Sequence, residues 1–132
     1  LTDQECCDEA LLNGEAKEND DGGVVCCYGR KVACNWKPYE ENTRGAVFVN
    51  RCVIAHENCH IPQTHSCLCD RVYRPGVQRP LTKPTSECLC YRAQLDCLED
   101  SIPACGVGNP DCGLIKSSIR GTSGWINYFC SE

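Results

Sequence analysis

Two histidines and a glutamate in one short stretch carry the clearest chemical signal in the chain. His56, Glu57 and His60 follow the pattern H-E-x-x-H. If this stretch is helical, His56 and His60 lie one turn apart on the same face, so both imidazoles can reach one Zn²⁺ ion. Glu57 then lies beside the ion, where a carboxylate can act as a general base toward water. The pattern predicts metal chemistry and favours hydrolysis.

The third metal ligand has to come from elsewhere in the chain, because a catalytic zinc ion has three protein ligands and one open position. Glu87 is the first candidate, since it begins a second predicted helix that can lie antiparallel to the first. Tyr91 follows one turn later and would offer a phenol to a developing oxyanion. His65 is the second candidate, although it lies only five residues after His60. Two weaker candidates are Asp70 and Asp96.

Cysteine dominates the rest of the composition. The 132 residues include 15 cysteines, a density typical of a disulfide scaffold in an oxidising compartment. We therefore expect the chain to be secreted or delivered to an extracellular or periplasmic space. Because 15 is an odd number, at least one thiol is free, bound to metal or bridged to another chain.

The charge and the apolar patterning exclude other classes of protein. The net charge of −5 gives no support for nucleic-acid binding, which requires a basic face. No apolar run is long enough to span a bilayer, and no signal-peptide pattern is present. The chain begins at Leu1 rather than at methionine, so we expect a processed product or an excised domain.

Caps, turns and prolines predict mainly helices around one β-hairpin. Thr2 and Glu5 form a capping box, and Gly29-Arg30 suits a two-residue hairpin turn. Pro62 is expected to stop the helix that carries the histidines. The predicted elements are helices over 2–12, 46–61 and 84–100 (ending before Pro103), strands over 24–28 and 31–36, a loop over 63–84, a last helix from Asn109 to Gly121, and a short helical tail over 125–130.

Three segments carry a resemblance to a known family. They are residues 24–34, residues 52–60 with Cys52 ahead of the H-E-x-x-H, and residues 86–98 with Ser86-Glu87-Cys88. They resemble a cysteine-rich zincin domain, of gluzincin-like arrangement, at the C-terminal ends of bacterial polymorphic toxins, including Rhs-type and type VI secretion effectors. Cys90 stands where the family pattern has alanine. The resemblance implies a metallopeptidase delivered to a neighbouring cell, with a cognate immunity protein as partner.

The sequence thus predicts a single α+β, mainly α, disulfide-stapled domain over residues 1–132 that holds one Zn²⁺ and hydrolyses a peptide or protein substrate. The predicted metal ligands are His56, His60 and Glu87. Glu57 is the predicted base and Tyr91 the predicted oxyanion donor. One alternative is a non-catalytic, cysteine-rich secreted binding module. The other is a structural-zinc module whose ligands would come from Cys59, His60, His65, Cys67 and Cys69.

Overall fold

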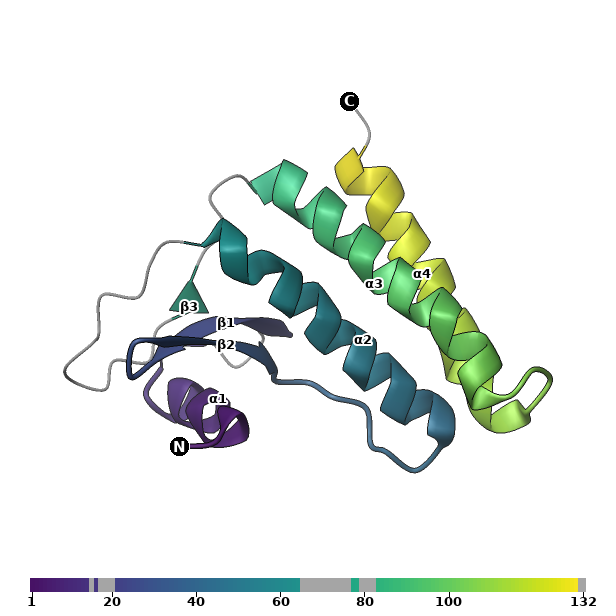
Figure 1. The fold of residues 1–132 in the computed structure, drawn as a ribbon, viewed down its shortest axis with the longest axis horizontal. Helices are drawn as coiled ribbons and strands as arrows, with labels where there is room; N and C mark the ends of the chain where they lie inside the picture. The colour runs from purple at the N-terminus through teal and green to yellow at the C-terminus, as the bar shows by residue number, and fades with distance from the viewer. Residues whose placement is uncertain (15, 17–20, 65–76, 79–82, 131–132) are drawn as a thin grey trace.

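A long central helix lies between a β-hairpin on one side and a pair of helices on the other (Figure 1). The structure is a computed structural model that describes residues 1–14, 16, 21–64, 77–78 and 83–130. The architecture is α+β and mainly α, as predicted. The elements in chain order are α1 (Asp3–Leu12), β1 (Gly22–Cys27), β2 (Arg30–Asn35), α2 (Arg44–His60), a 3₁₀ turn η1 (Ile61–Gln63), β3 (Val77–Gln78), α3 (Lys83–Cys105), a second 3₁₀ turn η2 (Pro110–Cys112) and α4 (Gly113–Cys130).

The hairpin turn lies one residue earlier than the sequence predicted. Cys27 pairs with Arg30, so Tyr28 and Gly29 are the central residues, and both have positive φ values of 52° and 79°. Two positive φ values are typical of a type I′ turn, which matches the twist of the strands. Because the shift moves each cross-strand partner by two positions, every side chain keeps its predicted face. Short strand β3, within the predicted loop 63–84, adds to the other edge of β1.

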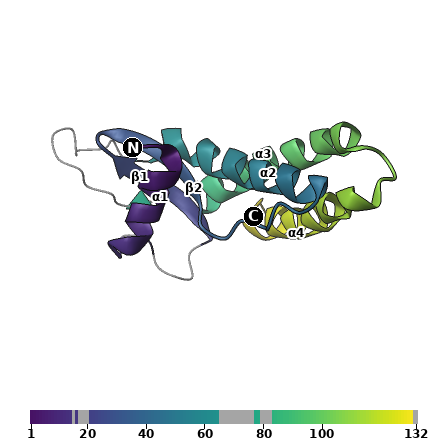
Figure 2. The ribbon, with the colours of Figure 1, turned by 90° about the horizontal axis from the view of Figure 1, so that it is seen from below.

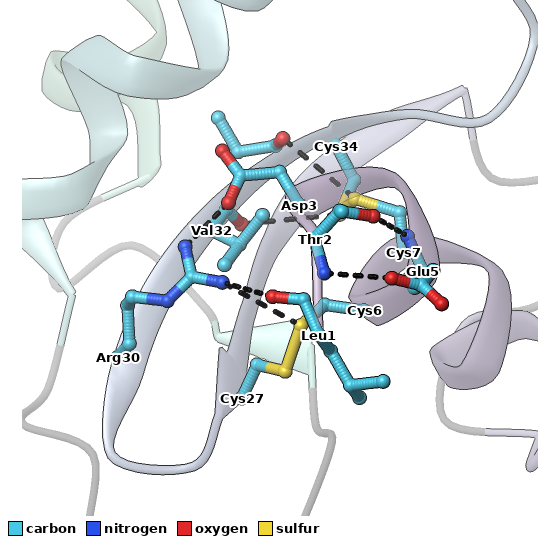
Figure 3. Close-up of polar contacts among 11 residues, drawn as sticks. Leu1, Thr2, Asp3, Glu5, Cys6, Cys7, Cys27, Arg30, Val32 and Cys34 are labelled. Carbon is cyan, nitrogen blue, oxygen red and sulfur yellow. Dashed lines mark hydrogen bonds and ion pairs between the residues drawn. A yellow bond between two sulfur atoms is a disulfide. The ribbon is translucent and has the colours of Figure 1, made fainter.

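Helix α1 covers the outer face of the hairpin and is fastened there covalently. The predicted capping box is present, with Thr2 and Glu5 bonded to each other's backbone N–H groups. Disulfides Cys6–Cys27 and Cys7–Cys34 join α1 to both strands around a small apolar core. Arg30 adds an ion pair with Asp3 and donates to the Leu1 carbonyl at 3.2 Å (Figure 3).

The hairpin in turn lies against the C-terminal half of α2, as two views at right angles show (Figures 1 and 2). Thr43 caps the start of α2 by accepting from the Ala46 N–H at 3.1 Å. At the other end, the Lys31 ammonium of β2 donates to the carbonyls of Ile61 and Thr64 at 3.1 and 3.2 Å. A cation at a helix C-terminus stabilises the carbonyls that have no partner within the helix. Lys31 therefore fixes the hairpin beside the histidine-bearing turns.

The third and fourth helices are both longer than the sequence predicted. Helix α3 continues through Pro103 to Cys105, although proline removes one helical hydrogen bond. The last turn is held from outside by the Cys105–Cys112 disulfide and by Arg44, which donates to the Ala104 carbonyl at 3.0 Å. Helix α4 runs past Gly121 without a break, so that glycine does not end it and the predicted tail 125–130 is its last turns.

Three more disulfides join the long helices to each other. Cys52–Cys97 and Cys59–Cys90 link α2 to α3, and Cys88–Cys130 links α3 to α4. Between these helices lies a second apolar core that includes Leu98 and Ile115. The six disulfides with both ends in the described part of the chain indicate an oxidising environment. Among the described helices, none combines the length and the apolar character that a bilayer span requires.

Candidate metal centre

Three side-chain atoms from α2 and α3 converge on one point. His56 Nε2 and His60 Nε2 lie 3.1 Å apart, since the two histidines are one helical turn apart. Glu87 Oε1 of α3 lies 2.6 Å from His60 Nε2 and 3.4 Å from His56 Nε2. Both histidines are buried, with exposures of 5% and 4%, and the Glu87 side chain is 16% exposed. Two of the predicted ligands therefore come from α2 and meet the third from α3.

The two disulfides between α2 and α3 explain why these atoms meet. Cys59 directly precedes His60, and its partner Cys90 lies three residues after Glu87, so one bridge flanks the convergence point. Cys52–Cys97 lies about two turns further along both helices. Two bridges along one helix pair fix both the distance and the rotation of the helices. The orientation of the site is thus a consequence of the cysteine positions.

Glu57 provides a second carboxylate beside the histidines. Of the described residues, His56, Glu57 and His60 form a group that could hold a metal ion, with one ligand atom from each within 4.8 Å of the others. The Glu57 carboxylate lies against the start of β1, where a Cβ at Gly22 would stand only 2.8 Å from Glu57 Oε2. Glycine at position 22 is therefore required for strand β1 to approach the carboxylate so closely. Burial raises the pKa of the Glu57 carboxyl above its usual value.

The two ring nitrogens of His60 both face acceptors. Gln63 Oε1 lies 3.0 Å from His60 Nδ1, and Glu87 Oε1 lies beside Nε2. Burial acts to lower the pKa of His60, but hydrogen bonds to Glu87 and Gln63 outweigh it and raise the pKa. Burial likewise acts to raise the pKa of Glu87, and the two histidines reverse this and lower it to about 2. The Glu87 carboxyl is therefore ionised at neutral pH, beside the ring of His60.

Tyr91 also lies beside the histidine pair, one helical turn after Glu87. Its ring meets the His56 ring edge-on, with centroids 4.3 Å apart. Burial first, and then the nearby carboxylates of Glu87 and Glu57, raise the pKa of Tyr91 to about 12. The phenol therefore stays protonated at neutral pH and can donate a hydrogen bond. Trp125 and Phe129 of α4 stack beside it, with centroids 6.1 and 5.7 Å from the Tyr91 ring.

A cleft of about 360 Å³ opens next to His56 and Glu57. Its walls come from the hairpin, the segment that follows β2, and helices α2, α3 and α4. Asn50 of α2 fixes the segment after β2, because it bonds both the N–H and the carbonyl of Tyr39, at 2.9 and 2.8 Å. The lining residues are Asp21, Gly22, Asn35, Lys37, Tyr39, Val49, Val53, His56, Glu57, Tyr91, Gln94, Ser118, Gly121, Thr122 and Trp125.

The structure separates the candidate ligands that the sequence left open. Glu87 and Tyr91 both lie at the histidine pair, whereas Asp96 is exposed further along α3. Cys59 is bridged to Cys90, so it is not a free thiolate for the structural-zinc alternative. His60, also a candidate of that alternative, lies at the histidine pair. Its other candidates, His65, Cys67 and Cys69, lie outside the described residues, as does the weaker carboxylate candidate Asp70.

Gln63, Gly22 and Trp125 are site residues that the sequence did not single out. Gln63 follows Pro62 and ends the 3₁₀ turn η1, which brings its amide oxygen to within 3.0 Å of His60 Nδ1. The only signal was proximity to the second histidine. Gly22 and Trp125 lie at the site because strand β1 and helix α4 pack there. No local pattern in the sequence predicts this packing.

Replacing Gln63 with leucine should weaken zinc binding by about 10- to 100-fold, as expected for loss of a group that orients a histidine ligand. Gln63→Glu keeps an acceptor for His60 Nδ1 and should retain most of the affinity. Competition with a chelator of known affinity measures the effect. Gln4→Leu, an exposed glutamine on α1, is the matched control. Equal zinc affinity in Gln63→Leu and the unmodified protein would rule out the orienting role.

In comparisons with known proteins, no family model, no curated protein and no solved structure matches the chain.

Proposed function

We propose that this chain is a zinc-dependent hydrolase of peptide or amide bonds. The observation that carries the proposal is the convergence of His56 Nε2, His60 Nε2 and Glu87 Oε1, with separations of 2.6 to 3.4 Å. Ligand atoms bonded to one tetrahedral Zn²⁺ stand about 3.3 Å apart, because each bond is about 2.0 Å long. The separations of 3.1 and 3.4 Å are close to this spacing, and the 2.6 Å between Glu87 Oε1 and His60 Nε2, a hydrogen-bond distance, is shorter than it.

The set of donors also fits zinc better than calcium or magnesium. Two imidazole nitrogens and one carboxylate oxygen form a set that occurs in catalytic zinc sites, whereas calcium and magnesium prefer oxygen ligands alone. Three protein ligands leave a fourth position for water or substrate. The ionised Glu87 supplies negative charge that offsets part of the charge of the cation. His56, His60 and Glu87 are therefore the proposed ligands.

The remaining side chains have distinct proposed roles. Zinc, when bound, would lower the pKa of water and polarise a carbonyl group. Glu57 would accept the proton from water and return it to the leaving amine, and its raised pKa suits both transfers. Tyr91, protonated at neutral pH, would donate a hydrogen bond to the developing oxyanion. Helix α3 would thus supply one ligand and one donor.

The biological setting remains a prediction from the family resemblance. Disulfides between the elements that carry the ligands suit a domain that works outside a reducing cytoplasm. On this proposal the domain is a secreted toxin or effector, and its partners are a peptide or protein substrate and a cognate immunity protein.

The proposed activity can be tested with a pool of synthetic peptides and mass spectrometry. The protein is stripped of metal, divided, and one part is reloaded with one equivalent of Zn²⁺. We expect cleavage products from the reloaded protein and none from the stripped protein. Reloaded protein that holds zinc but cleaves no peptide of the pool would contradict the hydrolase proposal.

A further inference from the structure

The cleft beside His56 is lined mainly by polar side chains. Ten of the fifteen residues that line it have polar or charged side chains, and one of its two valines, Val49, is only 2% exposed. Two of its carboxylates lie close enough to interact, since Asp21 contributes to the raised pKa of Glu57. The occupant of such a cleft has to pair with polar groups, so the charges and the hydrogen-bonding groups decide what fits.

The charges in and beside the cleft would balance when zinc is bound. Lys37 and Asp21 form an ion pair of 3.7 Å, so each already has a counter-charge. The two positive charges of the ion would offset the carboxylates of Glu57 and Glu87. A charged side chain that entered the cleft would lose water without gaining a counter-charge, which costs free energy. The charges therefore favour a neutral occupant.

One uncharged polar group in the cleft is nearly buried and has no partner. Thr122 of α4 is 5% exposed, and its hydroxyl makes no hydrogen bond to any described residue. Ser101 of α3 is buried to a similar degree, and its hydroxyl donates to the Cys97 carbonyl at 2.7 Å, as buried polar groups usually do. Among the described residues, the one fully buried side-chain atom that lacks a partner is His56 Nδ1. The Thr122 hydroxyl is therefore not fully enclosed, and the cleft that Thr122 lines is open to it.

Three further side chains leave hydrogen-bonding groups free in the same cleft. Gln94 of α3 and Ser118 of α4 make no side-chain hydrogen bond to a described residue. The Asn35 oxygen accepts from the Lys37 N–H at 3.1 Å, which leaves the Asn35 NH₂ group without a partner in the described part of the chain. Together with Thr122, these groups come from β2, α3 and α4, and they offer both donors and acceptors.

An amide side chain matches these groups better than a hydroxyl or an apolar side chain does. An amide has two N–H donors and an oxygen with two lone pairs, so it can make up to four hydrogen bonds. A hydroxyl can make at most three, and an apolar side chain makes none. A site built to hydrogen-bond its substrate rejects an analogue that lacks the polar group, because the polar groups of the site then stay unpaired.

We propose that the cleft binds a peptide through the amide side chain of a glutamine or asparagine, and that Thr122 and Gln94 determine this specificity. Gln94 lies about one helical turn beyond Tyr91, and Thr122 about one turn before Trp125, which stacks on Tyr91. The bound side chain would therefore lie close to the metal centre. The inference rests on the proposed function in one respect, since the bound peptide would be the substrate, but binding itself requires no catalysis.

Two substitutions of Thr122 separate the hydroxyl from the packing of the side chain. Thr122→Val keeps a similar shape and removes the hydroxyl, whereas Thr122→Ser keeps the hydroxyl. Ser123→Ala is the matched control, because Ser123 lies on the same helix and does not line the cleft. Circular dichroism and zinc content should be the same in all three variants and in the parent protein.

Binding is measured with short blocked peptides that carry a fluorescent label and differ only in a central Gln, Glu, Lys or Met, four unbranched side chains. All proteins are zinc-loaded and carry Glu57→Gln, so that no peptide is cut. Because this substitution removes a negative charge beside the cleft, it favours the Glu peptide and makes the comparison with Gln stringent. We expect the Gln peptide to bind at least about tenfold more tightly than the other three.

The variants should affect the Gln peptide selectively. Thr122→Val should weaken its binding by at least about tenfold, without weakening the binding of the Met peptide. Thr122→Ser and Ser123→Ala should retain the affinity of the parent protein. The inference is overturned if no peptide binds, if the Glu, Lys or Met peptide binds as tightly as the Gln peptide, or if Thr122→Val binds the Gln peptide normally.

Cleavage by protein with Glu57 intact separates the inference from the proposed function. Selective binding of the Gln peptide without cleavage would leave the cleft specificity standing and contradict the hydrolase. Equally fast cleavage of all four peptides, unaffected by Thr122→Val, would do the reverse.

Discussion

Zinc-loaded Glu57→Gln protein should keep its metal and its fold and lose about 10²- to 10⁴-fold in the rate of peptide hydrolysis. The half-buried carboxylate lies within 4.8 Å of the histidine ring nitrogens and packs against Gly22, so it can reach a group that reacts at the proposed metal centre. The amide of glutamine has a similar shape and cannot accept the proton. The measurement is kcat on a peptide that the unmodified protein cleaves.

Glu99→Gln is the control for this substitution, because it makes the same chemical change at an exposed position of α3. It should retain full activity. Zinc content measured on both variants separates loss of a base from loss of metal. If Glu57→Gln hydrolysed the peptide at the normal rate, Glu57 would not be the base. If it lost zinc instead, Glu57 would be a ligand.

Removal of the Glu87 carboxylate should weaken zinc binding by more than about 100-fold, because a direct ligand contributes more than a group that only orients one. Glu87 Oε1 is the atom of α3 that approaches both histidine nitrogens. Chelator competition on Glu87→Ala gives the affinity. Glu99→Ala on the same helix is the control and should bind zinc normally.

His65→Ala addresses the competing third ligand. If Glu87 is the ligand, His65→Ala should weaken zinc binding much less than Glu87→Ala does. The opposite order would replace the gluzincin-like assignment with one in which the third ligand is a histidine close in sequence. If both variants bound zinc as tightly as the unmodified protein, neither Glu87 nor His65 would be the third ligand.

The sequence predicted the parts of the fold that local signals determine. The capping box at Thr2 placed the start of α1 correctly, and the helix that carries His56 and His60 begins and ends within two residues of its predicted limits. The errors arose where tertiary contacts outweigh local rules. Pro103 stays inside α3 because Arg44 and the Cys105–Cys112 bridge hold that turn.

Glycine gave a misleading signal in α4. Gly121 was expected to end the helix, yet the helix continues for nine more residues to Cys130. The Cys88–Cys130 disulfide and the stacking of Trp125 and Phe129 against Tyr91 stabilise these last turns. Such contacts form between residues far apart in the chain, so no window of sequence reveals them.

In the candidate site, too, local signals predicted some features, whereas others depend on tertiary contacts. The positions of His56 and His60 follow from helical periodicity, and Glu87 was singled out because its helix could lie against theirs. The approach of Glu87 to within 2.6 Å of His60 depends on which cysteines pair, and cysteine pairing cannot be deduced from spacing. The hydrogen bond from His60 to Gln63 depends on the 3₁₀ turn after α2, which a helix-stop signal alone does not specify.

Zinc content is the most direct test of the metal centre. Purified protein is stripped of metal and dialysed against Zn²⁺, and its zinc content is measured by elemental mass spectrometry. A variant that carries both His56→Ala and His60→Ala is treated in the same way. We expect about one zinc ion per chain in the unmodified protein and none retained at the same free zinc concentration in the double variant. Equal zinc content and affinity in the two proteins would contradict the metal centre at these histidines.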